Sequence, residues 1–207
     1  MSDESNGLIY FENGDIRDKK YRHENSAIVQ ILNCVGVRPH GLSMTLAEAF
    51  PYCNLYIDRS PIRNFNRAKI KDRSKPGTIR ICQPKENKYK NPFIVNIFGQ
   101  YYMGKSIDNN NSISQRIIRQ KNVDKDLIEG IRLDTRENRI NWFQQGLDQL
   151  SESFIVKNKL IDIVFPFKIG CGLGGGDWEN DYLPAIEKFA EKVKENNVIV
   201  TIVKKQI

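Results

Sequence analysis

The sequence predicts a single α/β domain, with a mixed, mostly parallel sheet covered by helices on both faces. Short apolar runs rich in β-branched residues alternate along the chain with segments of helical periodicity. Such an alternation is typical of parallel sheets that are buried on both sides. The length of 207 residues fits one domain, and neither a repeat nor a linker divides the chain.

Six segments have the pattern of β-strands. Most are continuous apolar runs, as expected of strands buried on both faces, whereas Thr78–Cys82 alternates and should have one face in water. Turn-forming residues such as Asn13, Gly14 and Gly99 end several of them. The predicted strands are Leu8–Phe11, Ala27–Leu32, Thr78–Cys82, Phe93–Phe98, Leu160–Phe165 and Val198–Val203.

Three segments have apolar residues at helical spacing. They are Gly41–Phe50, Arg139–Phe154 and Asp181–Asn196. Asp181 is the predicted N-cap of the last one, because it places Pro184 in the first turn, where no helical N–H is lost. These three helices are the ones expected to cover the sheet.

The segment Met103–Glu137 has weak periodicity and contains the polar tract Asp108–Ser112. We expect a mobile loop here, with one helical turn near Asp124–Gly130. Whether this polar loop closes over a ligand is left open by the sequence.

Positive charge is concentrated in Arg59–Lys90. This segment contains eleven Lys or Arg residues and only two acidic residues, and the net charge of the whole chain is +7. One interpretation is a solvated basic insertion. The other is a surface that attracts polyanions such as nucleic acid. Aromatic residues are sparse in the segment, so a base-stacking platform is not indicated.

The four cysteines are not arranged as metal ligands. No CxxC pair occurs and the chain has only two histidines, so we expect buried, reduced thiols, no metal and no cofactor. Apolar runs of about six residues are far below the roughly 20 needed to span a bilayer. The polar, acidic beginning is unlike a signal peptide. We therefore expect an intracellular protein, cytoplasmic or nuclear, that is not secreted and has no membrane partner.

A glycine-rich run, Gly170–Trp178, lies between a predicted strand and a predicted helix, and five of its first seven residues are glycine. Glycines allow backbone N–H groups to approach an anion, and a helix start adds partial positive charge. The run therefore predicts a phosphate site; the alternative is a turn packed tightly under a helix. A dinucleotide fingerprint would open a βαβ unit, and a Walker A loop would end in Gly-Lys-Ser/Thr, so neither motif fits.

Three parts of the sequence together resemble the macro domain, an ADP-ribose-binding module. They are the opening strand with its Gly14-Asp15-Ile16 turn, the strand end Ile31–Cys34 followed by His40-Gly41-Leu42, and Ile169–Trp178. The sequence of Ile169–Trp178 is similar to the variant of this loop found in the branch of the family that includes ADP-ribosyl glycohydrolases and ADP-ribose-1''-phosphate phosphatases. The resemblance implies one three-layer α/β/α domain over residues 1–207, with a six-stranded sheet, a basic insertion around 59–90 and a polar loop around 103–137.

The resemblance also implies a role for each matching residue. Asp15 and Ile16 would contact the adenine, Asn33 the distal ribose, and His40, Gly41 and Leu42 the diphosphate. The second phosphate loop would consist of Ile169, Gly170, Cys171, Gly172, Leu173, Gly174, Gly175 and Gly176. Two positions differ from many members: Gly36 and Gly174 stand where an asparagine and an aspartate occur elsewhere.

The activity implied by the resemblance is binding of ADP-ribose, or of an ADP-ribosylated macromolecule, and hydrolysis of a mono-ADP-ribosyl linkage on protein or nucleic acid. Two alternatives stay open: an ADP-ribose-1''-phosphate phosphatase and a non-catalytic reader. For catalysis, Asp177 is the candidate base, with a helix cap as its alternative role. His40 is a candidate acid or base, and Lys105 a candidate for a lysine that serves in some members. Nucleic acid would contact Arg59–Lys90.

Overall fold

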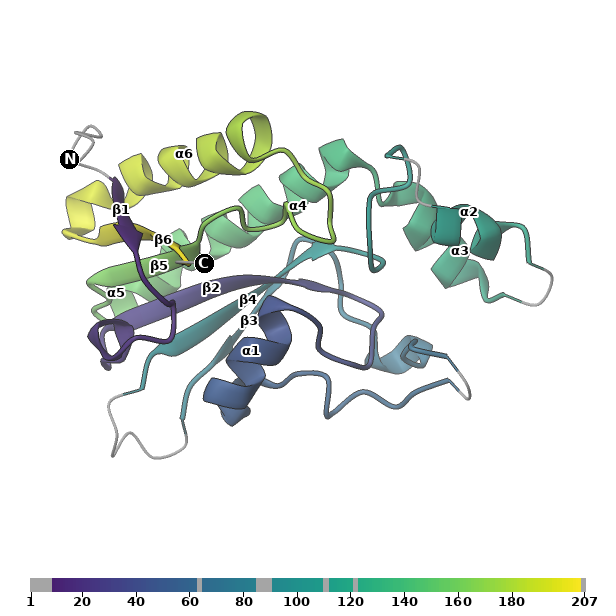
Figure 1. The fold of residues 1–207 in the computed structure, drawn as a ribbon, viewed down its shortest axis with the longest axis horizontal. Helices are drawn as coiled ribbons and strands as arrows, with labels where there is room; N and C mark the ends of the chain where they lie inside the picture. Colours follow the sequence, from purple (N-terminus) through teal and green to yellow (C-terminus); the bar gives the residue numbers. More distant parts are fainter. Residues whose placement is uncertain (1–8, 63–64, 85–90, 110–111, 121–122, 206–207) are drawn as a thin grey trace.

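The computed structural model describes residues 9–62, 65–84, 91–109, 112–120 and 123–205. Its centre is a six-stranded sheet in the order β1-β6-β5-β2-β4-β3 (Figure 1). All neighbouring strands are parallel except β3, which runs antiparallel to β4 at one edge. The predicted mixed, mostly parallel sheet is confirmed. The strands are β1 (Ile9–Asn13), β2 (Ser26–Asn33), β3 (Ile79–Cys82), β4 (Phe93–Gln100), β5 (Asp162–Pro166) and β6 (Ile199–Lys204).

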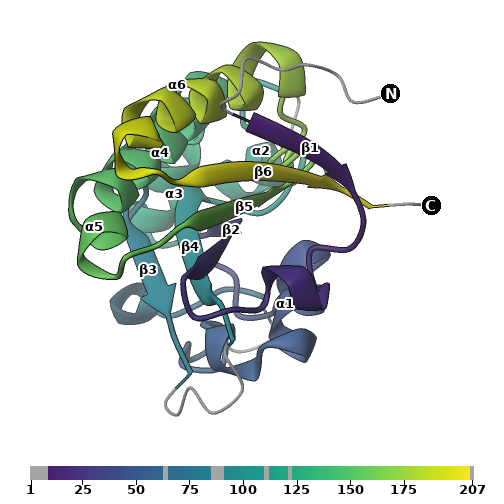
Figure 2. The same cartoon turned by 90° about the vertical axis from the view of Figure 1, so that its left-hand side faces the viewer.

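Helices cover the sheet on both faces, which gives the three layers expected from the sequence (Figure 2). Helices α4 and α6 lie on one face and α1 on the other, whereas α2 and α3 project beyond one end of the sheet (Figure 1). The helices are α1 (Leu42–Ala49), α2 (Ser112–Ile118), α3 (Lys125–Leu133), α4 (Arg136–Gln149), α5 (Ile155–Lys157) and α6 (Leu183–Val193). No helix in these described ranges is both long and apolar enough to cross a membrane.

Two apolar cores result from this layering, one on each face of the sheet. Phe143 of α4 and Ile186 of α6 are fully buried against Phe165 of β5. On the opposite face, Leu46 of α1 packs with Ile28 of β2. Strands between two cores must be apolar on both sides, which explains why their sequences read as continuous apolar runs.

The expectation of a loop over Met103–Glu137 is wrong, because the segment contains α2 and all of α3. The helical turn expected near Asp124–Gly130 is part of α3. Asp124 caps α3 by accepting a hydrogen bond from the N–H of Leu127 at 2.8 Å. Leu127 and Ile131, four residues apart, are fully buried. The two helices are only seven and nine residues long, so the apolar spacing of each repeats too few times to stand out in the sequence. The residues 110–111 of the predicted polar tract lie outside the described part of the chain.

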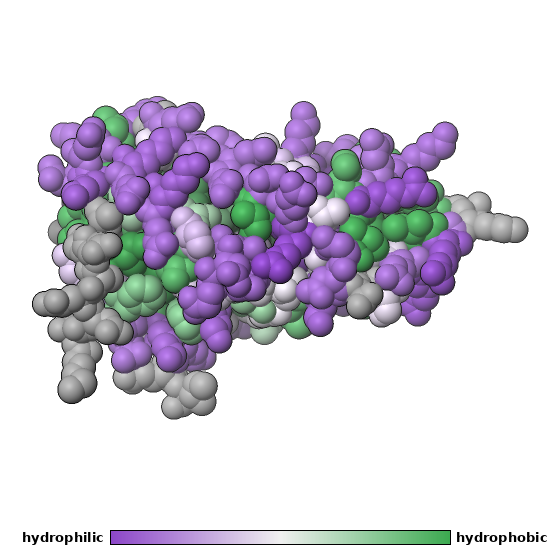
Figure 3. Space-filling view, turned by 90° about the horizontal axis from the view of Figure 1, so that it is seen from above, coloured by the Kyte–Doolittle hydropathy of each residue, from purple (hydrophilic) through white to green (hydrophobic). Residues whose placement is uncertain are grey.

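Some apolar side chains of the projecting helices reach the surface. The face above α4 and α6 is mostly hydrophilic, with smaller apolar areas toward both ends, including the end where α2 and α3 project (Figure 3). Ile113 of α2 and Leu133 of α3 are each 52% exposed. The protrusion is thus only partly buried against the main body.

The prediction that Asp181 caps the last helix is also wrong. A π-helical turn, Trp178–Tyr182, precedes α6, and the carboxylate of Asp177 caps it by accepting from the N–H of Asn180 at 3.1 Å. The Asp181 carboxylate accepts the N–H of Asp177 instead and pairs with Arg136 of α4. The glycine run thus leads directly into a capped turn.

The basic segment Arg59–Lys90 is more than a solvated insertion, because it contributes β3 to the sheet and several of its arginines are internal. The Arg73 guanidinium, with only 3% of its side chain exposed, binds Asp124 and Asp126 of α3 at 2.6 Å. The buried Arg67 guanidinium lies 4.2 Å from the centre of the Phe65 ring. Arg63, Lys85, Lys88 and Lys90 fall outside the described residues.

Candidate functional site

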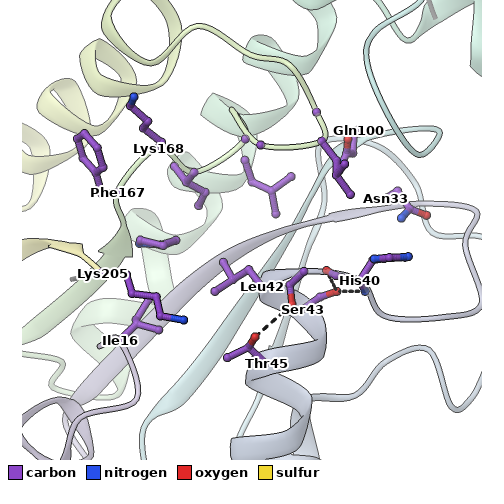
Figure 4. A pocket seen from close by; sticks show the side chains of 18 of the residues that line it. Ile16, Asn33, His40, Leu42, Ser43, Thr45, Gln100, Phe167, Lys168 and Lys205 are labelled. Atoms are coloured by element: carbon purple, nitrogen blue, oxygen red, sulfur yellow. Dashed lines mark hydrogen bonds between the residues drawn. The ribbon is translucent and has the colours of Figure 1, made fainter. Parts of the chain in front are cut away.

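A cleft of about 550 Å³ opens at the carboxyl edge of the parallel strands (Figure 4). Strands β2, β4, β5 and β6 each contribute a residue at or near their carboxyl ends, and Asp15 follows β1. Ligands of open α/β sheets bind at this edge, and the volume lies within the range of small-molecule sites. Eleven of the fourteen predicted ligand-binding residues line the cleft: Asp15, Ile16, Asn33, His40, Gly41, Leu42, Ile169, Gly170, Gly172, Leu173 and Gly174.

The cleft has two distinguishable ends. Ile16 and Lys205 lie at one end, and Asn33 and Gln100 lie at the other (Figure 4). The loop after β5, which includes Lys168, forms one wall. A ligand that fills the cleft from end to end must therefore be elongated.

At the first end, the Asp15 carboxylate is fixed by Arg17. The backbone N–H and the Nε of Arg17 both donate to Oδ1 at 2.8 Å, and a terminal nitrogen donates to Oδ2 at 2.6 Å. The hydrogen bonds from the Arg17 side chain are the main reason that the pKa of Asp15 falls to about 2. Asp15 is therefore ionised and acts only as an acceptor.

The depressed pKa of Asp15 predicts how its contribution to ligand binding depends on pH. Asp15→Asn should weaken an adenine-containing ligand several-fold, and this loss should be constant between pH 5 and pH 9. In the folded protein the carboxylate loses its charge only as the pH falls toward about 2, because its pKa is lowered to about 2. Calorimetry with ADP-ribose at several pH values measures this; a loss that changes near neutral pH would contradict it.

At the other end, Asn33 is held by the backbone that follows β2. Its Oδ1 accepts from the N–H of Gly36 at 2.5 Å, which leaves the amide nitrogen as the donor. A side chain at Gly36 would collide with the Asn33 amide, since a Cβ there would lie 2.8 Å from Oδ1. Glycine at position 36 thus leaves room for the Asn33 amide in this orientation.

The start of α1 lies in the middle of the cleft. Ser43 closes the first turn, because its hydroxyl accepts from the N–H of His40 and donates to the His40 carbonyl, both at 2.9 Å (Figure 4). Gly41 has φ +54°, and a Cβ on it would meet no atom within 4 Å. Backbone N–H groups at a helix start beside an open glycine suit an anion.

The glycines of the predicted phosphate loop fall into two classes. Gly172 faces open space, since a Cβ on it would meet no atom within 4 Å. The others are closely packed: the Tyr182 ring would lie within 2.3 Å of a Cβ at Gly170 or Gly176, and the Gly170 carbonyl within 2.6 Å of one at Gly174. Tight packing therefore explains most of the glycines, and only Gly172 is left open for a ligand.

Three residues of the predicted phosphate loop do not line the cleft: Cys171, Gly175 and Gly176. Burial is the main reason that the pKa of the Cys171 thiol rises to about 11, which makes it a poor nucleophile. A Cβ on Gly175 would lie 2.9 Å from the Cγ of Lys105, so Lys105 packs on the outside of the loop.

Of the three predicted catalytic residues, only His40 lines the cleft. The Asp177 carboxylate accepts from both the N–H and the side chain of Asn180 and lies 3.3 Å from Arg136. These hydrogen bonds lower the pKa of Asp177, so it is a weak base. Lys105 is exposed and also lies outside the lining.

A buried ion pair, unrecognised in the sequence, supports the glycine loop from behind. The guanidinium of Arg139 binds Asp134 through two bonds of 2.8 and 2.7 Å, and both side chains are nearly inaccessible. The same arginine donates to the carbonyls of Gly104 and Gly174 at 2.8 and 3.0 Å. It therefore joins two segments that line the cleft.

Other lining residues missed by the sequence analysis come from strand ends and loops. Gln100 ends β4, and Lys205 follows β6; both could have been found by listing polar residues at the carboxyl ends of predicted strands. Tyr56 and Met103 carry no such signal. In the described ranges, no group of three or more His, Cys, Asp or Glu side chains could hold a metal.

Fold and site together define an α/β protein with a ligand cleft at the carboxyl edge of its sheet. No family model matches the sequence, and no curated protein does. The structure is similar to the DarG macrodomain of Thermus aquaticus, with TM-score 0.56 and 18% identity over 94% of this chain and 97% of that one. The chain thus has the macrodomain fold.

Two further solved structures agree with this assignment. The DarG macrodomain of Mycobacterium tuberculosis has TM-score 0.52 and 16% identity, over 95% of this chain and 98% of that one. A point mutant of the Oceanobacillus iheyensis macrodomain has TM-score 0.51 and 17% identity, over 96% and 84%. These similarities extend over nearly the whole chain, so the fold is shared without large missing parts.

Proposed function

We propose that the protein binds ADP-ribose, free or attached to a macromolecule, in the cleft. The main support for the proposal is the order of groups along the cleft. The Asp15 carboxylate lies at one end, glycines with free space beside them lie in the middle, and the Asn33 side-chain amide lies at the other end. Asp15 suits the adenine amino group, Gly41 and Gly172 suit the two phosphates, and Asn33 suits the distal ribose hydroxyls. The order of these groups matches the order of chemical groups along ADP-ribose.

We further propose that the protein hydrolyses a mono-ADP-ribosyl linkage on protein or nucleic acid. Of the predicted catalytic residues, His40 is supported by its position in the cleft lining. It would act as an acid or base toward the attacking water. The position of Asp177 in a cap, outside the lining, favours the second candidate function, a non-catalytic reader. Phosphatase action on ADP-ribose-1''-phosphate is the third possibility, and it would use the same cleft.

Binding and turnover separate these functions. We expect calorimetry to show ADP-ribose binding, and we expect release of ADP-ribose from a mono-ADP-ribosylated protein or DNA. His40→Ala should slow release at least about tenfold, and by more than it weakens binding, as is common for a lost acid or base. Asp177→Asn is the matched control and should change release little.

The outcomes are distinct. Binding without release from ADP-ribosylated protein, ADP-ribosylated DNA or ADP-ribose-1''-phosphate would establish a reader. Phosphate release from ADP-ribose-1''-phosphate alone would establish a phosphatase. Absence of ADP-ribose binding would refute the proposal as a whole.

A further inference from the structure

We propose that Arg59 is a positioning residue of the cleft: a buried cation whose charge is balanced by an anionic ligand rather than by a carboxylate of the protein. The inference rests on the proposed function and adds to it a residue that does not line the cleft. Its basis is the environment of Arg59 behind the Asn33–Gly36 turn.

Arg59 is almost fully enclosed, with 8% of the residue exposed. One terminal nitrogen donates to the carbonyls of Asn33 and Gly36, at 3.2 and 2.6 Å. The other donates to the Ser74 hydroxyl at 3.0 Å. The guanidinium therefore holds the turn that carries Asn33, a residue of the cleft lining.

The partners of this guanidinium are uncharged. It lies 5.0 Å from the centre of the Tyr56 ring and 5.7 Å from that of Phe98. No carboxylate among the described residues forms an ion pair with it; Asp58, next to it in sequence, pairs with Arg80. Burial lowers the pKa of Arg59. An arginine keeps its proton even so, and the positive charge remains.

A buried charge acts on its surroundings through a medium of low polarity, and so over several ångströms. Two of the groups that enclose Arg59, Asn33 and Tyr56, themselves line the cleft. An anion in the cleft would therefore gain from the Arg59 charge without touching it, whereas an uncharged ligand would not.

The test compares a charged ligand with an uncharged one. Arg59→Gln retains hydrogen-bond donors but removes the charge, and calorimetry would measure the affinities for ADP-ribose and for adenosine. We expect ADP-ribose to bind at least about tenfold more weakly, and adenosine to change less than about twofold. Arg80→Gln, which removes an exposed charge, is the matched control and should change both little.

Arg59→Lys tests the charge if Arg59→Gln does not fold. It should retain the preference for ADP-ribose over adenosine even where both affinities fall. Equal losses for both ligands with Arg59→Gln, or a lost preference with Arg59→Lys, would show a purely structural role. If the unmodified protein does not bind ADP-ribose, the proposed function fails; if it binds and only the preference is insensitive to Arg59, this inference alone fails.

Discussion

Gly172→Glu is expected to abolish ADP-ribose binding without lowering the melting temperature. A Cβ at Gly172 meets no atom within 4 Å, and the residue is not among the glycines with positive φ, so the new side chain costs the fold little. Its carboxylate would point into the part of the cleft where we place the phosphates. Like charges at such a contact cost several kcal/mol, which corresponds to a loss of at least about 100-fold in affinity.

Two neighbouring changes serve as controls for this variant. Gly172→Ala should bind ADP-ribose nearly as well as the unmodified protein, since it adds only a methyl group in open space. Gly174→Glu should lose binding and stability together, because its Cβ would lie 2.6 Å from the Gly170 carbonyl. Calorimetry and thermal unfolding measure both properties; full binding by Gly172→Glu would exclude this loop from the phosphate site.

Arg139→Met is expected to have the largest effect on stability. The substitution leaves the Asp134 carboxylate buried and without its cation, and leaves the carbonyls of Gly104 and Gly174 without a donor. Breaking one side of a buried ion pair costs roughly 3–5 kcal/mol. For a domain of this size, that corresponds to a melting temperature lower by roughly 6–20 °C. Chemical and thermal unfolding would measure the loss.

A double variant separates the ion pair from the packing of the arginine. Asp134→Asn combined with Arg139→Met should be more stable than Arg139→Met alone, because it removes the uncompensated charge. Lys192→Met, which removes a cation from an exposed pair with Asp148, should change the melting temperature little. A loss of less than about 1 kcal/mol for Arg139→Met would contradict the supporting role of this ion pair.

The sheet and the main lining of the cleft were predictable from the sequence because both depend on local signals. Apolar runs mark strands, and glycine composition marked the loop after one of them, whereas Asp15 and Asn33 were indicated by the resemblance to macro domains. Helix α2 was missed, and α3 was predicted only as one turn, because each helix is too short for its apolar spacing to repeat clearly. The buried roles of Arg59 and Arg73 were not predictable, because their partners are far along the chain or are backbone carbonyls. Arg139 binds the nearby Asp134, but its burial depends on the distant loops whose carbonyls it also binds.

The glycine run shows the same limit in one motif. Its composition correctly indicated a loop at the cleft, but the sequence could not separate glycines that admit a ligand from those that admit a neighbouring ring. The structure distinguishes the two kinds of glycine, because the Tyr182 ring occupies the space beside Gly170 and Gly176. Both interpretations of the run, an open loop and a tightly packed turn, thus apply to different residues within it.

The pairing of β1 with β6 has a consequence for the folding of the chain during synthesis. Ile9 of β1 lies opposite Val200 of β6, and β6 is the only neighbour of β1 in the described sheet. Strand β1 therefore cannot form its sheet hydrogen bonds until β6 has been synthesised. The end of the cleft with Asp15 and Lys205 depends on the same pairing, because these residues follow the two strands. Contacts so distant along the chain form slowly and late. The nascent protein thus acquires its complete cleft only after the residues up to Lys205 have left the ribosome.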